Sequence, residues 1–307
     1  MRLTFLGTGG SWPTRRRGSQ SIALTHGSGS ILIDCGEGTQ RQLVQSQVSP
    51  MKVRDILITH LHGDHFLGLP GLVQTMALND RTEVLNVWGP KGISRSWEMA
   101  MGMCPFTEKF ETRVHELEGG ETFEVIGLTA SCMVVKHSVP TLAYRIDEKE
   151  RPGRFHREKA LELGVPKGPL WRKLQSGESV TFKLNGEQRT VVPDQILDPP
   201  RPGRSVVISG DTSPSADLID LARGADVLVH EATFTSDLEE LADEVTHSTV
   251  AGAAGIAKKA GVGKLVLVHS SPRYTKDESF QKYIKEAIDS FQDVLVPEDL
   301  DVLEITR

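Results

Sequence analysis

Residues 56–65 read Ile56-Leu57-Ile58-Thr59-His60-Leu61-His62-Gly63-Asp64-His65, and this stretch decides how the rest of the chain is interpreted. An apolar run of strand length ends in three histidines and one aspartate. Imidazole nitrogens and carboxylate oxygens are ligands of divalent ions such as Zn²⁺. His60 and His62 leave one face of an extended backbone, and the glycine lets Asp64 and His65 turn toward a second position. The alternative is a polar loop that happens to contain three histidines, and the density of ligand-type residues favours a metal site.

Length and composition are those of an ordinary soluble protein. The chain has 307 residues, of which 38% are hydrophobic and 25% charged, so it can bury a sizeable core, and α/β folds of this length occur as single domains. It has no N-terminal apolar signal region and no run of about 18 apolar residues, which predicts neither secretion nor membrane spanning. Three widely spaced cysteines, Cys35, Cys104 and Cys132, lack a C-x-x-C pair and favour a reducing cytoplasm. Cys35 and Cys132 are expected to be small buried hydrophobes.

Charge is distributed unevenly along the chain. The net charge of −6 argues against non-specific binding of nucleic acid by the whole surface. Residues 148–203, however, contain eleven Lys/Arg, eight Asp/Glu and seven of the sixteen prolines, so this segment is net positive. Only 157–163 has a helical pattern there, which predicts a protruding arm or a long irregular insertion. A polyanionic partner could therefore bind this segment alone.

The remaining pattern predicts two halves in which strands are followed by helices. Strands are expected at 2–6, 21–25, 30–34, 84–88, 264–268 and 300–305, with two more across 122–136 and further sheet pattern at 205–212 and 225–234. Helices are expected at 40–47, 92–102, 250–260 and 278–291, and residues 66–71 lead into a further apolar helix that ends near Asn79. The glycine-rich turn after the first strand does not match a dinucleotide-binding loop, because Trp12 stands where the third glycine is required.

Ligand-type residues recur where the expected strands end, namely His60, His62, Asp64, His65, His137, Asp211 and His269. Seven donors are too many for one tetrahedral ion with an open position, and they suit two ions that share a carboxylate. One ion would be held by His60, His62 and His137. The other would be held by Asp64, His65 and His269, with Asp211 as the bridge. A lone strand-end histidine is usually a core residue, but four separate segments that carry the same chemistry favour ligands.

The stretch His60–His65, taken with His137, Asp211 and His269, resembles the metallo-β-lactamase superfamily. Within it, the chain resembles the ribonuclease Z family through Phe5-Leu6-Gly7-Thr8-Gly9, 34–39, 230–234, 247–249 and Gly168-Pro169. The resemblance implies an α/β fold, the metallo-β-lactamase αββα sandwich, as a single domain over residues 1–307 with an inserted flexible arm at 148–203. It also implies two Zn²⁺ ions per subunit. Asp34 is expected to accept N–H hydrogen bonds beside the metals rather than to bind them.

The same resemblance implies an activity and roles for individual residues. The enzyme would be an endoribonuclease that removes the 3′ trailer from precursor tRNA, leaving a 3′-hydroxyl on the tRNA and a 5′-phosphate on the trailer. Asp64 would be the base for the attacking water, and His247, oriented by Glu231, would protonate the leaving oxygen. The arm would bind tRNA phosphates through Arg151, Arg154, Arg157 and Lys159. The resemblance further implies a cytoplasmic homodimer.

Residues 13–18 depart from the family pattern. They keep the proline and Arg17 of a loop that is common in the family, but lack its lysine and asparagine. Arg15 and Arg17 are expected to face RNA phosphate, and a solvated basic run is the alternative. Trp12 and Tyr274 would either stack on nucleobases or pack in the core.

Two other classes of function stay open at this stage. A dinuclear hydrolase of small phosphodiesters or related esters would use the same metal site, but it would not need a basic arm. A scaffold or RNA-binding protein with a degenerate site would lack one or more ligands, and none is missing from this sequence.

Overall fold

A computed structural model describes residues 1–103, 105–150 and 152–306, and the chain divides into two compact units. The first unit comprises Met1–Asp147 and Arg204–Arg307, and the second comprises Glu148–Gly203. Among the described helices, none combines the length and the apolar character needed to span a bilayer. Cys35 and Cys132 are free and buried, as expected, whereas Cys104 lies outside the described residues.

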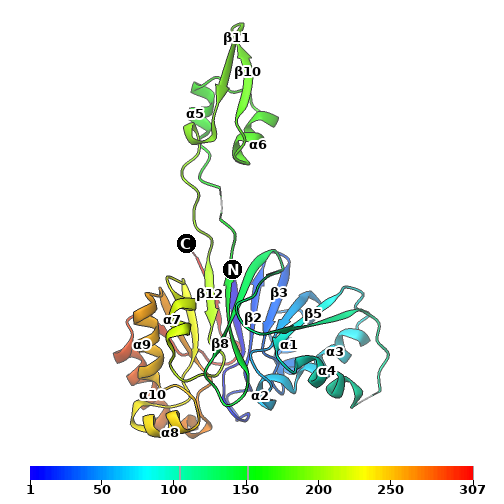
Figure 1. The fold of residues 1–307 in the computed structure, drawn as a ribbon, viewed down its shortest axis with the longest axis vertical. Coiled ribbons are helices and arrows are strands. Elements are labelled where there is room, and N and C mark those ends of the chain that lie inside the picture. The colour runs from blue at the N-terminus through cyan, green and yellow to red at the C-terminus, as the bar shows by residue number, and fades with distance from the viewer. Residues whose placement is uncertain (104, 151, 307) are drawn as a thin grey trace. The chain divides into compact units, whose positions relative to one another are not determined.

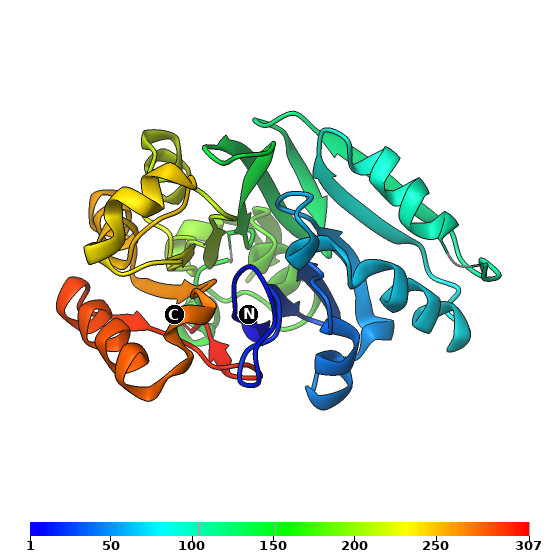
Figure 2. The same ribbon diagram turned by 90° about the horizontal axis from the view of Figure 1, so that it is seen from below.

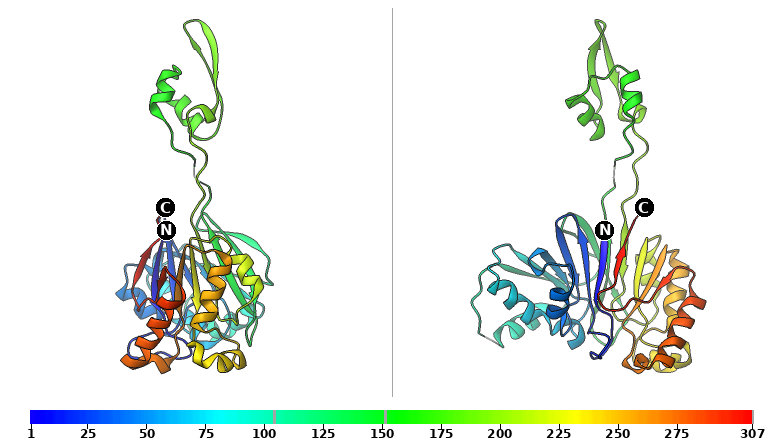
Figure 3. Two further views of the ribbon diagram at one scale, coloured as in Figure 1. Left: turned by 90° about the vertical axis from the view of Figure 1, so that its left-hand side faces the viewer. Right: turned by 180° about the vertical axis from the view of Figure 1, so that it is seen from behind.

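The first unit contains two large sheets. Over the described residues, the first sheet has the order β16 (Val302–Glu304), β1 (Arg2–Gly7), β2 (Ser21–His26), β3 (Gly29–Ile33), β4 (Val53–Leu57), β5 (Leu85–Pro90) and β6 (Thr112–Leu117). The second has the order β15 (Val294–Leu295), β14 (Lys264–Val268), β13 (Val227–Glu231), β12 (Ser205–Ile208), β9 (Thr141–Asp147), β8 (Leu128–Val135) and β7 (Thr122–Val125). β1 and β16 pair with Arg2 opposite Glu304, so the two chain termini lie at one edge of the unit (Figure 3).

Helices cover the outer face of each sheet (Figure 2). The first sheet carries α1 (Thr39–Gln45), α3 (Leu69–Leu78) and α4 (Ile93–Gly102), and the second carries α7 (Ala216–Ala222), α9 (Val250–Ala260) and α10 (Asp277–Ser290). Shorter elements are η1 (Pro50–Lys52), α2 (Gly63–Phe66), η3 (Ser236–Leu238), α8 (Glu239–Glu244) and η4 (Pro272–Thr275). α9 begins where the sequence predicts, because the Thr249 hydroxyl accepts the Gly252 N–H at 3.0 Å.

Three hydrophobic cores account for the four layers of this unit. Strand residues alternate between faces, so Val227 and Val229 enter the core between the sheets, while Leu228 enters the core under the helices. The core between the sheets joins Leu3 and Phe5 of the first sheet to residues of the second. Both faces of each sheet are therefore buried, which explains why the strands read as continuous apolar runs rather than as polar and apolar alternation.

The second unit has a core of its own. It contains α5 (Arg157–Glu162), α6 (Pro169–Gln175), β10 (Val180–Leu184), β11 (Glu187–Val191) and η2 (Pro193–Gln195) (Figure 1). Its buried apolar side chains are Ala160, Val165, Leu174, Val180, Val191 and Ile196. β10 and β11 are joined by Asn185 and Gly186, whose φ angles of 53° and 89° match a two-residue hairpin turn.

Of the two alternatives for residues 148–203, the long irregular insertion is wrong, because the segment contains a second helix and a hairpin. α6 and the β10–β11 hairpin were not predicted, although Asn185-Gly186 is a recognised hairpin signal. Four of the five β11 residues are exposed, so the strand lacks the apolar alternation by which strands are recognised in a sequence. β6 and β9 were also absent from the predicted strands, although β9 is largely buried and follows Pro140, which is a turn signal.

Substitution of Gly36 tests how tightly the turn that carries Asp64 is packed. A Cβ at this position would overlap the Asp64 carbonyl oxygen and approach the Ser19 Cβ to 2.6 Å. We expect Gly36→Ala to lower the free energy of unfolding by about 1–3 kcal/mol, because backbone must move to make room. Denaturant unfolding in the presence of a chelator measures this without a contribution from bound metal.

Gly255→Ala is the matched control, because Gly255 lies inside α9 with no atom within 4 Å of the added carbon. This variant should be stabilised by up to about 1 kcal/mol through reduced backbone entropy of the unfolded chain. Equal stability changes in the two variants would contradict the close packing described at Gly36.

Candidate active site

The candidate active site lies at the edge of the first unit where strands from both sheets end. β4 ends at Leu57, and the chain continues through His60 and His62 into α2, which carries Asp64 and His65 at the lower edge in Figure 1. The second sheet contributes residues directly after β8, β12 and β14, namely His137, Asp211 and His269. All seven sequence-predicted ligands are therefore brought to one place, although their roles as ligands stay a prediction.

The first group of donors comprises His60, His62 and His137. The Nδ1 atom of His62 lies 3.1 Å from Nε2 of His60 and 3.3 Å from Nε2 of His137. One nitrogen from each of the three rings lies within 4.8 Å of the other two. Three imidazoles from two sheets thus direct nitrogen atoms at one point.

The second group comprises Asp64, His65 and His269. Nε2 of His269 lies 3.3 Å from Oδ2 of Asp64, and Nε2 of His65 lies 3.7 Å from the same oxygen. Oδ2 of Asp211 is 3.2 Å from Nε2 of His269 and 3.5 Å from Nε2 of His65. That oxygen is also 3.7 Å from Nε2 of His60, so Asp211 faces both groups, as a bridging carboxylate must.

The donor spacing fits divalent cations. Nitrogen ligands about 2.0–2.1 Å from a tetrahedral Zn²⁺ lie roughly 3.3–3.4 Å from one another, and the observed separations of 3.1–3.7 Å bracket that value. Nε2 of His65 is buried and has no hydrogen-bond partner among the described residues, although it faces two carboxylates. A buried polar atom normally has a partner, and a metal ion would supply one here. The spacing and the chemistry of these donors fit a divalent-metal site.

Most of the histidines are oriented by a hydrogen bond at the nitrogen that faces away from the cluster. Nδ1 of His137 donates to the Thr246 carbonyl at 3.0 Å, and Nδ1 of His269 lies 2.9 Å from the Thr233 hydroxyl. Nδ1 of His60 lies 3.0 Å from the hydroxyl of its neighbour Thr59. Such bonds select the tautomer in which Nε2 carries a lone pair for a metal.

Asp34 orients the fourth histidine and the turn that carries it. Its Oδ2 accepts the Nδ1–H of His65 at 2.8 Å, and its Oδ1 accepts the Thr59 N–H at 2.7 Å. The expectation that Asp34 accepts N–H bonds beside the ligands is confirmed. Asp34 has a φ of 58°, in the left-handed region that aspartate tolerates better than most residues.

The ionisation of the cluster follows from burial and from the neighbouring charges. Burial lowers the pKa of His60 well below its usual value, and the surrounding histidines lower it further. Burial also disfavours a charged His65, but the carboxylates of Asp211 and Asp34 outweigh it and raise the pKa of His65 well above its usual value. Burial raises the pKa of Asp211, yet His269 and His65 hold it well below the ordinary range. The Asp211 carboxylate therefore stays ionised, and its negative charge favours a bound cation.

His247 and Glu231 form a second titratable pair beside the metal ligands. Nδ1 of His247 lies 2.9 Å from Oε1 of Glu231, and the other Glu231 oxygen accepts the Thr233 hydroxyl at 2.8 Å. Burial lowers the pKa of His247, but the hydrogen bond and charge of Glu231 outweigh it and raise the pKa to about 9. His247 is half-buried and its ring stacks on His269 with centroids 5.4 Å apart, so it can reach a group bound at the ligands.

The loop after β1 closes one side of the site. The Ser11 N–H donates to Oδ2 of Asp64 at 2.8 Å, and the Gly10 N–H donates to the Ser270 carbonyl at 3.2 Å. Gly10 packs on the imidazole of His269, and a Cβ there would lie 2.6 Å from the ring. Glycine at this position is therefore a condition for bringing the loop backbone to the ligands.

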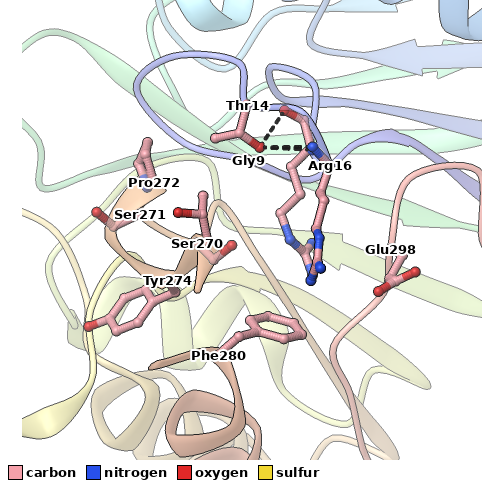
Figure 4. Close-up of a pocket in the computed structure, with 11 residues that line it drawn as sticks. Gly9, Thr14, Arg16, Ser270, Ser271, Pro272, Tyr274, Phe280 and Glu298 are labelled. Carbon is pink, nitrogen blue, oxygen red and sulfur yellow. Dashed lines mark hydrogen bonds between the residues drawn. The ribbon is translucent and has the colours of Figure 1, made fainter. Parts of the chain in front are cut away.

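A pocket of about 300 Å³ lies on the other side of this loop (Figure 4). It is bounded by Gly9, Thr14 and Arg16 of the loop and by Ser270, Tyr274 and Phe280 of the second half. The Arg16 side chain extends across it toward Phe280 (Figure 4) and pairs with Asp277 at 2.9 Å. The pocket is close to His269 but contains none of the seven ligands.

The cations expected to meet RNA differ in their environment. Arg15 is exposed and forms no ion pair within the described part of the chain. Arg17 is turned inward, where it donates to the Pro297 carbonyl at 2.7 Å and lies over the Phe280 ring. In the second unit Arg154, Arg157 and Lys159 are exposed, whereas Arg151 lies outside the described residues.

Comparison with known proteins assigns the family. Residues 1–148 match the family model described as Anti-Pycsar protein Apyc1, and residues 172–270 match the one described as Beta-lactamase superfamily domain. Ribonuclease Z of Methanosarcina acetivorans is 43% identical over 305 residues, which are 99% of this chain and 98% of that protein. This chain belongs to the ribonuclease Z family. Ribonuclease Z of Brevibacillus brevis is 40% identical and covers 100% of this chain and 98% of its own.

Solved structures place the ribonuclease Z fold in the metallo-β-lactamase class. Human tRNase Z, short form, superposes with a TM-score of 0.72 at 27% identity, and the alignment covers 100% of both chains. The metallo-beta-lactamase fold protein YhfI from Bacillus subtilis has a TM-score of 0.69 at 20% identity over 99% of both chains. The expected αββα metallo-β-lactamase fold is confirmed.

Three contributors to this ribonuclease Z site were not expected from the sequence. Thr59 and Thr233 hold ring nitrogens of His60 and His269, and the backbone of Ser11 holds Asp64. A threonine beside a ligand is too common to identify such a role. A backbone N–H carries no residue-specific signal at all.

Asp34→Asn tests whether this carboxylate controls the metal site. The amide keeps the shape of the side chain, but an NH₂ group that faces His65 would force the imidazole to carry its proton on Nε2. That nitrogen would no longer offer a lone pair, so we expect divalent-metal affinity to fall about 10–100-fold. Competition with a chromophoric zinc chelator measures this.

Glu37→Gln removes the same charge from an exposed position nearby and should leave the metal affinity unchanged. If both variants bind metal as tightly as the wild type, Asp34 does not control the site.

Proposed function

We propose that this chain is a zinc-dependent endoribonuclease that cleaves the 3′ trailer from precursor tRNA. The products would be a tRNA with a 3′-hydroxyl and a trailer with a 5′-phosphate. The observation that carries the proposal is that ribonuclease Z relatives align over at least 98% of both chains, so the metal ligands, the His247–Glu231 pair and residues 148–203 all lie inside the shared sequence. Incubating zinc-loaded protein with a 3′-extended precursor tRNA and mapping both new ends tests it.

Two zinc ions per subunit would be held in this site. His60, His62 and His137 would hold one ion, and Asp64, His65 and His269 the other, with Asp211 between them. When bound, the ions would supply Lewis-acid activation of water and would neutralise charge on the reacting phosphodiester. Nitrogen and oxygen donors without cysteine are typical of catalytic rather than closed structural zinc sites.

Asp64 would accept the proton of the attacking water. Its Oδ2 atom accepts the Ser11 N–H at 2.8 Å and lies 3.3 Å from Nε2 of His269. Although burial opposes ionisation, the neighbouring His269 and His65 hold the pKa of Asp64 below its usual value. An ionised carboxylate oriented by the Ser11 N–H can receive a proton without rearrangement.

His247 would donate a proton to the leaving 3′-oxygen of the tRNA. Because Nδ1 is engaged by Glu231, Nε2 is the nitrogen that can give up the proton. Bound cations nearby would lower the pKa of His247 from the value of about 9, toward the range in which a general acid works near neutral pH. Glu231 would orient the imidazole and stabilise its charged form.

Residues 148–203 would bind the tRNA away from the reacting phosphate. Exposed Arg154, Arg157 and Lys159, together with Arg151, are the cations that we assign to phosphate contacts. The unit has its own apolar core, so it can present these side chains from an ordered surface. Contacts to phosphate do not depend on the base sequence. They therefore suit tRNA precursors, which share a shape but differ in sequence.

A cytoplasmic homodimer is part of the proposal. The helices that cover the first sheet, and the turn between α2 and α3, expose five large apolar side chains: Val44, Leu67, Leu78, Met99 and Met103. A second copy of the chain would cover such a surface. A solution mass of one chain at micromolar concentration would contradict this assignment.

The small-molecule alternative is not favoured. The relatives that align with the whole chain are ribonuclease Z proteins, and a hydrolase of small phosphodiesters has no need for the basic segment at 148–203. A scaffold protein with a degenerate site is also not favoured, because all seven predicted donors are present and lie close together.

Two substitutions separate metal binding from proton donation. His60→Ala removes a predicted ligand, so it should lower zinc content and abolish cleavage. His247→Ala should keep both ions but slow cleavage of precursor tRNA by about 10²–10⁴-fold, the usual contribution of a general acid. Metal analysis and initial rates check both expectations.

A small diester with a good leaving group serves as the control substrate for the His247 variant, because such a leaving group needs little protonation. It should be slowed much less than precursor tRNA. Loss of zinc together with equal slowing of both substrates would show that His247 is a ligand instead.

Replacing residues 148–203 by a short glycine–serine link should leave the first unit folded. β9 and β12 are antiparallel with Asp147 opposite Ser205, so a few residues suffice to join them as a hairpin. The metal ligands lie outside the segment, and hydrolysis of the small diester should persist. Cleavage of precursor tRNA should fall sharply, as measured by kcat/KM. A truncated enzyme that processes precursor tRNA at the normal rate would contradict the binding role.

A milder form of this test uses charge alone. Changing Arg154, Arg157 and Lys159 to glutamine should weaken precursor binding and flatten its dependence on salt, since each neutralised phosphate releases counterions. Changing Lys258, Lys259 and Lys285, which are exposed on α9 and α10, removes the same charge elsewhere and should have little effect on the salt dependence.

A further inference from the structure

Trp12 is an exposed aromatic side chain in a chain whose other tryptophans are packed. Its side chain is 62% exposed, and among the described residues it forms neither a ring contact nor a hydrogen bond. By contrast, Trp88 stacks between His115 and Phe123, with centroids 3.8 Å and 4.2 Å away. Trp171 donates its indole N–H to the Val165 carbonyl at 3.0 Å. An indole without internal partners has no role in holding the fold together.

The position of Trp12 is tied to the active site through the backbone. The N–H of the preceding residue, Ser11, donates to Oδ2 of Asp64 at 2.8 Å. Since neighbouring Cα atoms are about 3.8 Å apart, the Cα of Trp12 lies within roughly 8 Å of that carboxylate oxygen. An indole reaches several ångströms beyond its Cα, which is the scale of one nucleotide.

The loop that carries Trp12 is held at several points. Its Gly10 N–H donates to the Ser270 carbonyl, and the Trp12 N–H donates to the Gly10 carbonyl at 2.8 Å. Pro13 follows directly and restricts Trp12 to extended backbone. A side chain on so constrained a backbone loses little entropy when a flat partner stacks on it.

We propose that Trp12 is a stacking platform for the nucleobase of the first trailer nucleotide, immediately 3′ of the scissile phosphate. The inference rests on the proposed function, because it requires an RNA strand that passes through the metal site. Aromatic side chains bind unpaired bases by stacking without regard to sequence, and trailers of different tRNAs differ in sequence. A stacking residue would therefore position any trailer.

Asp64 and His247, the two residues proposed to carry protons, indicate which side of the scissile phosphate lies near Trp12. In an in-line displacement the leaving oxygen and the attacking water lie on opposite sides of the phosphorus. His247, assigned to the leaving 3′-oxygen, marks the side of the mature tRNA. Trp12 is attached next to Asp64, which marks the side of the attacking water and thus lies away from the tRNA. The base nearest to Trp12 is then that of the trailer.

Charge beside the loop agrees with a strand that leaves in this direction. A groove of about 440 Å³ begins at Pro13, directly after Trp12. Four arginines, Arg15, Arg16, Arg17 and Arg41, and two carboxylates, Glu37 and Asp299, line it, so its lining is net positive. Arg15 and Arg41 are exposed and form no ion pair within the residues that the structure describes. Their guanidinium groups can bind the phosphates of the next trailer nucleotides.

The test compares Trp12→Ala with Trp12→Phe on precursor tRNA. Loss of one stacked base corresponds to about a 5- to 150-fold change, so KM should rise by that factor in Trp12→Ala while kcat changes less. Trp12→Phe keeps an aromatic face and should recover most of the loss. On a precursor that is abasic at the first trailer position, wild type and Trp12→Ala should have the same KM.

A spectroscopic readout places the base directly. 2-Aminopurine at the first trailer position should be quenched when wild-type holoenzyme binds, as followed by stopped flow before cleavage, and should stay bright with Trp12→Ala. The same probe in the last nucleotide of the tRNA should behave alike with both proteins. Ile288→Ala is the control variant, because it shortens an exposed apolar side chain elsewhere, on α10. It should match the wild type in KM and in quenching.

Different failures point to different errors. If the wild type does not cut precursor tRNA, the proposed function is wrong. If it cuts but Trp12→Ala has an unchanged KM, or an equal loss on the abasic precursor, the stacking role is wrong. The same holds if Trp12→Ala instead changes the sedimenting mass of the protein, because Trp12 would then contact another copy of the chain.

Discussion

The buried carboxylate of Asp34 is the constraint on which the rest of the site depends. It accepts the backbone N–H of Thr59 and the Nδ1–H of His65, and so it joins the end of β3 to the turn after β4 and to α2. A charged group in this position is costly unless its hydrogen bonds are complete, and here they are supplied by groups that carry or adjoin the ligands. The hydrogen bonds that compensate the burial of the Asp34 carboxylate therefore also orient His65 toward the other candidate ligands.

The candidate ligands meet because the two sheets, which pack face to face, are also joined by hydrogen bonds at the site. The Tyr144 hydroxyl of β9 donates to the Ile58 carbonyl at 2.8 Å, and the Leu142 N–H donates to the Thr59 carbonyl at 2.9 Å. These bonds fix the turn after β4 against the second sheet, which supplies His137, Asp211 and His269. Neither half has enough donors for two ions, so the relative position of the sheets decides metal binding.

The proposed activity distributes its requirements over separate parts of the molecule. The candidate metal ligands and the His247–Glu231 pair are buried or half-buried and are held by hydrogen bonds, which suits chemistry that depends on preorganised charge. Arg154, Arg157 and Lys159 of the second unit and Arg15 of the loop after β1 are exposed, where each contact with phosphate is weak and many are needed. Trp12 lies between these extremes, exposed but on a backbone fixed to Asp64.

The sequence by itself determined the ligand types. Three histidines and an aspartate lie within six residues, and further ligand types follow other strands, so a metal site has few alternatives. It also determined the layered α/β pattern, since apolar runs and caps such as Thr249 are local signals. The hairpin in 148–203 was missed although β10 alternates apolar and polar residues and is followed by Asn185-Gly186, because its partner β11 is mostly exposed and has no such alternation. Tertiary structure alone decided that Arg17 turns inward while Trp12 stays exposed, because burial depends on packing partners that are distant in the chain. It also decided that Ser11 supports Asp64, since that bond comes from a backbone group that every residue but proline possesses.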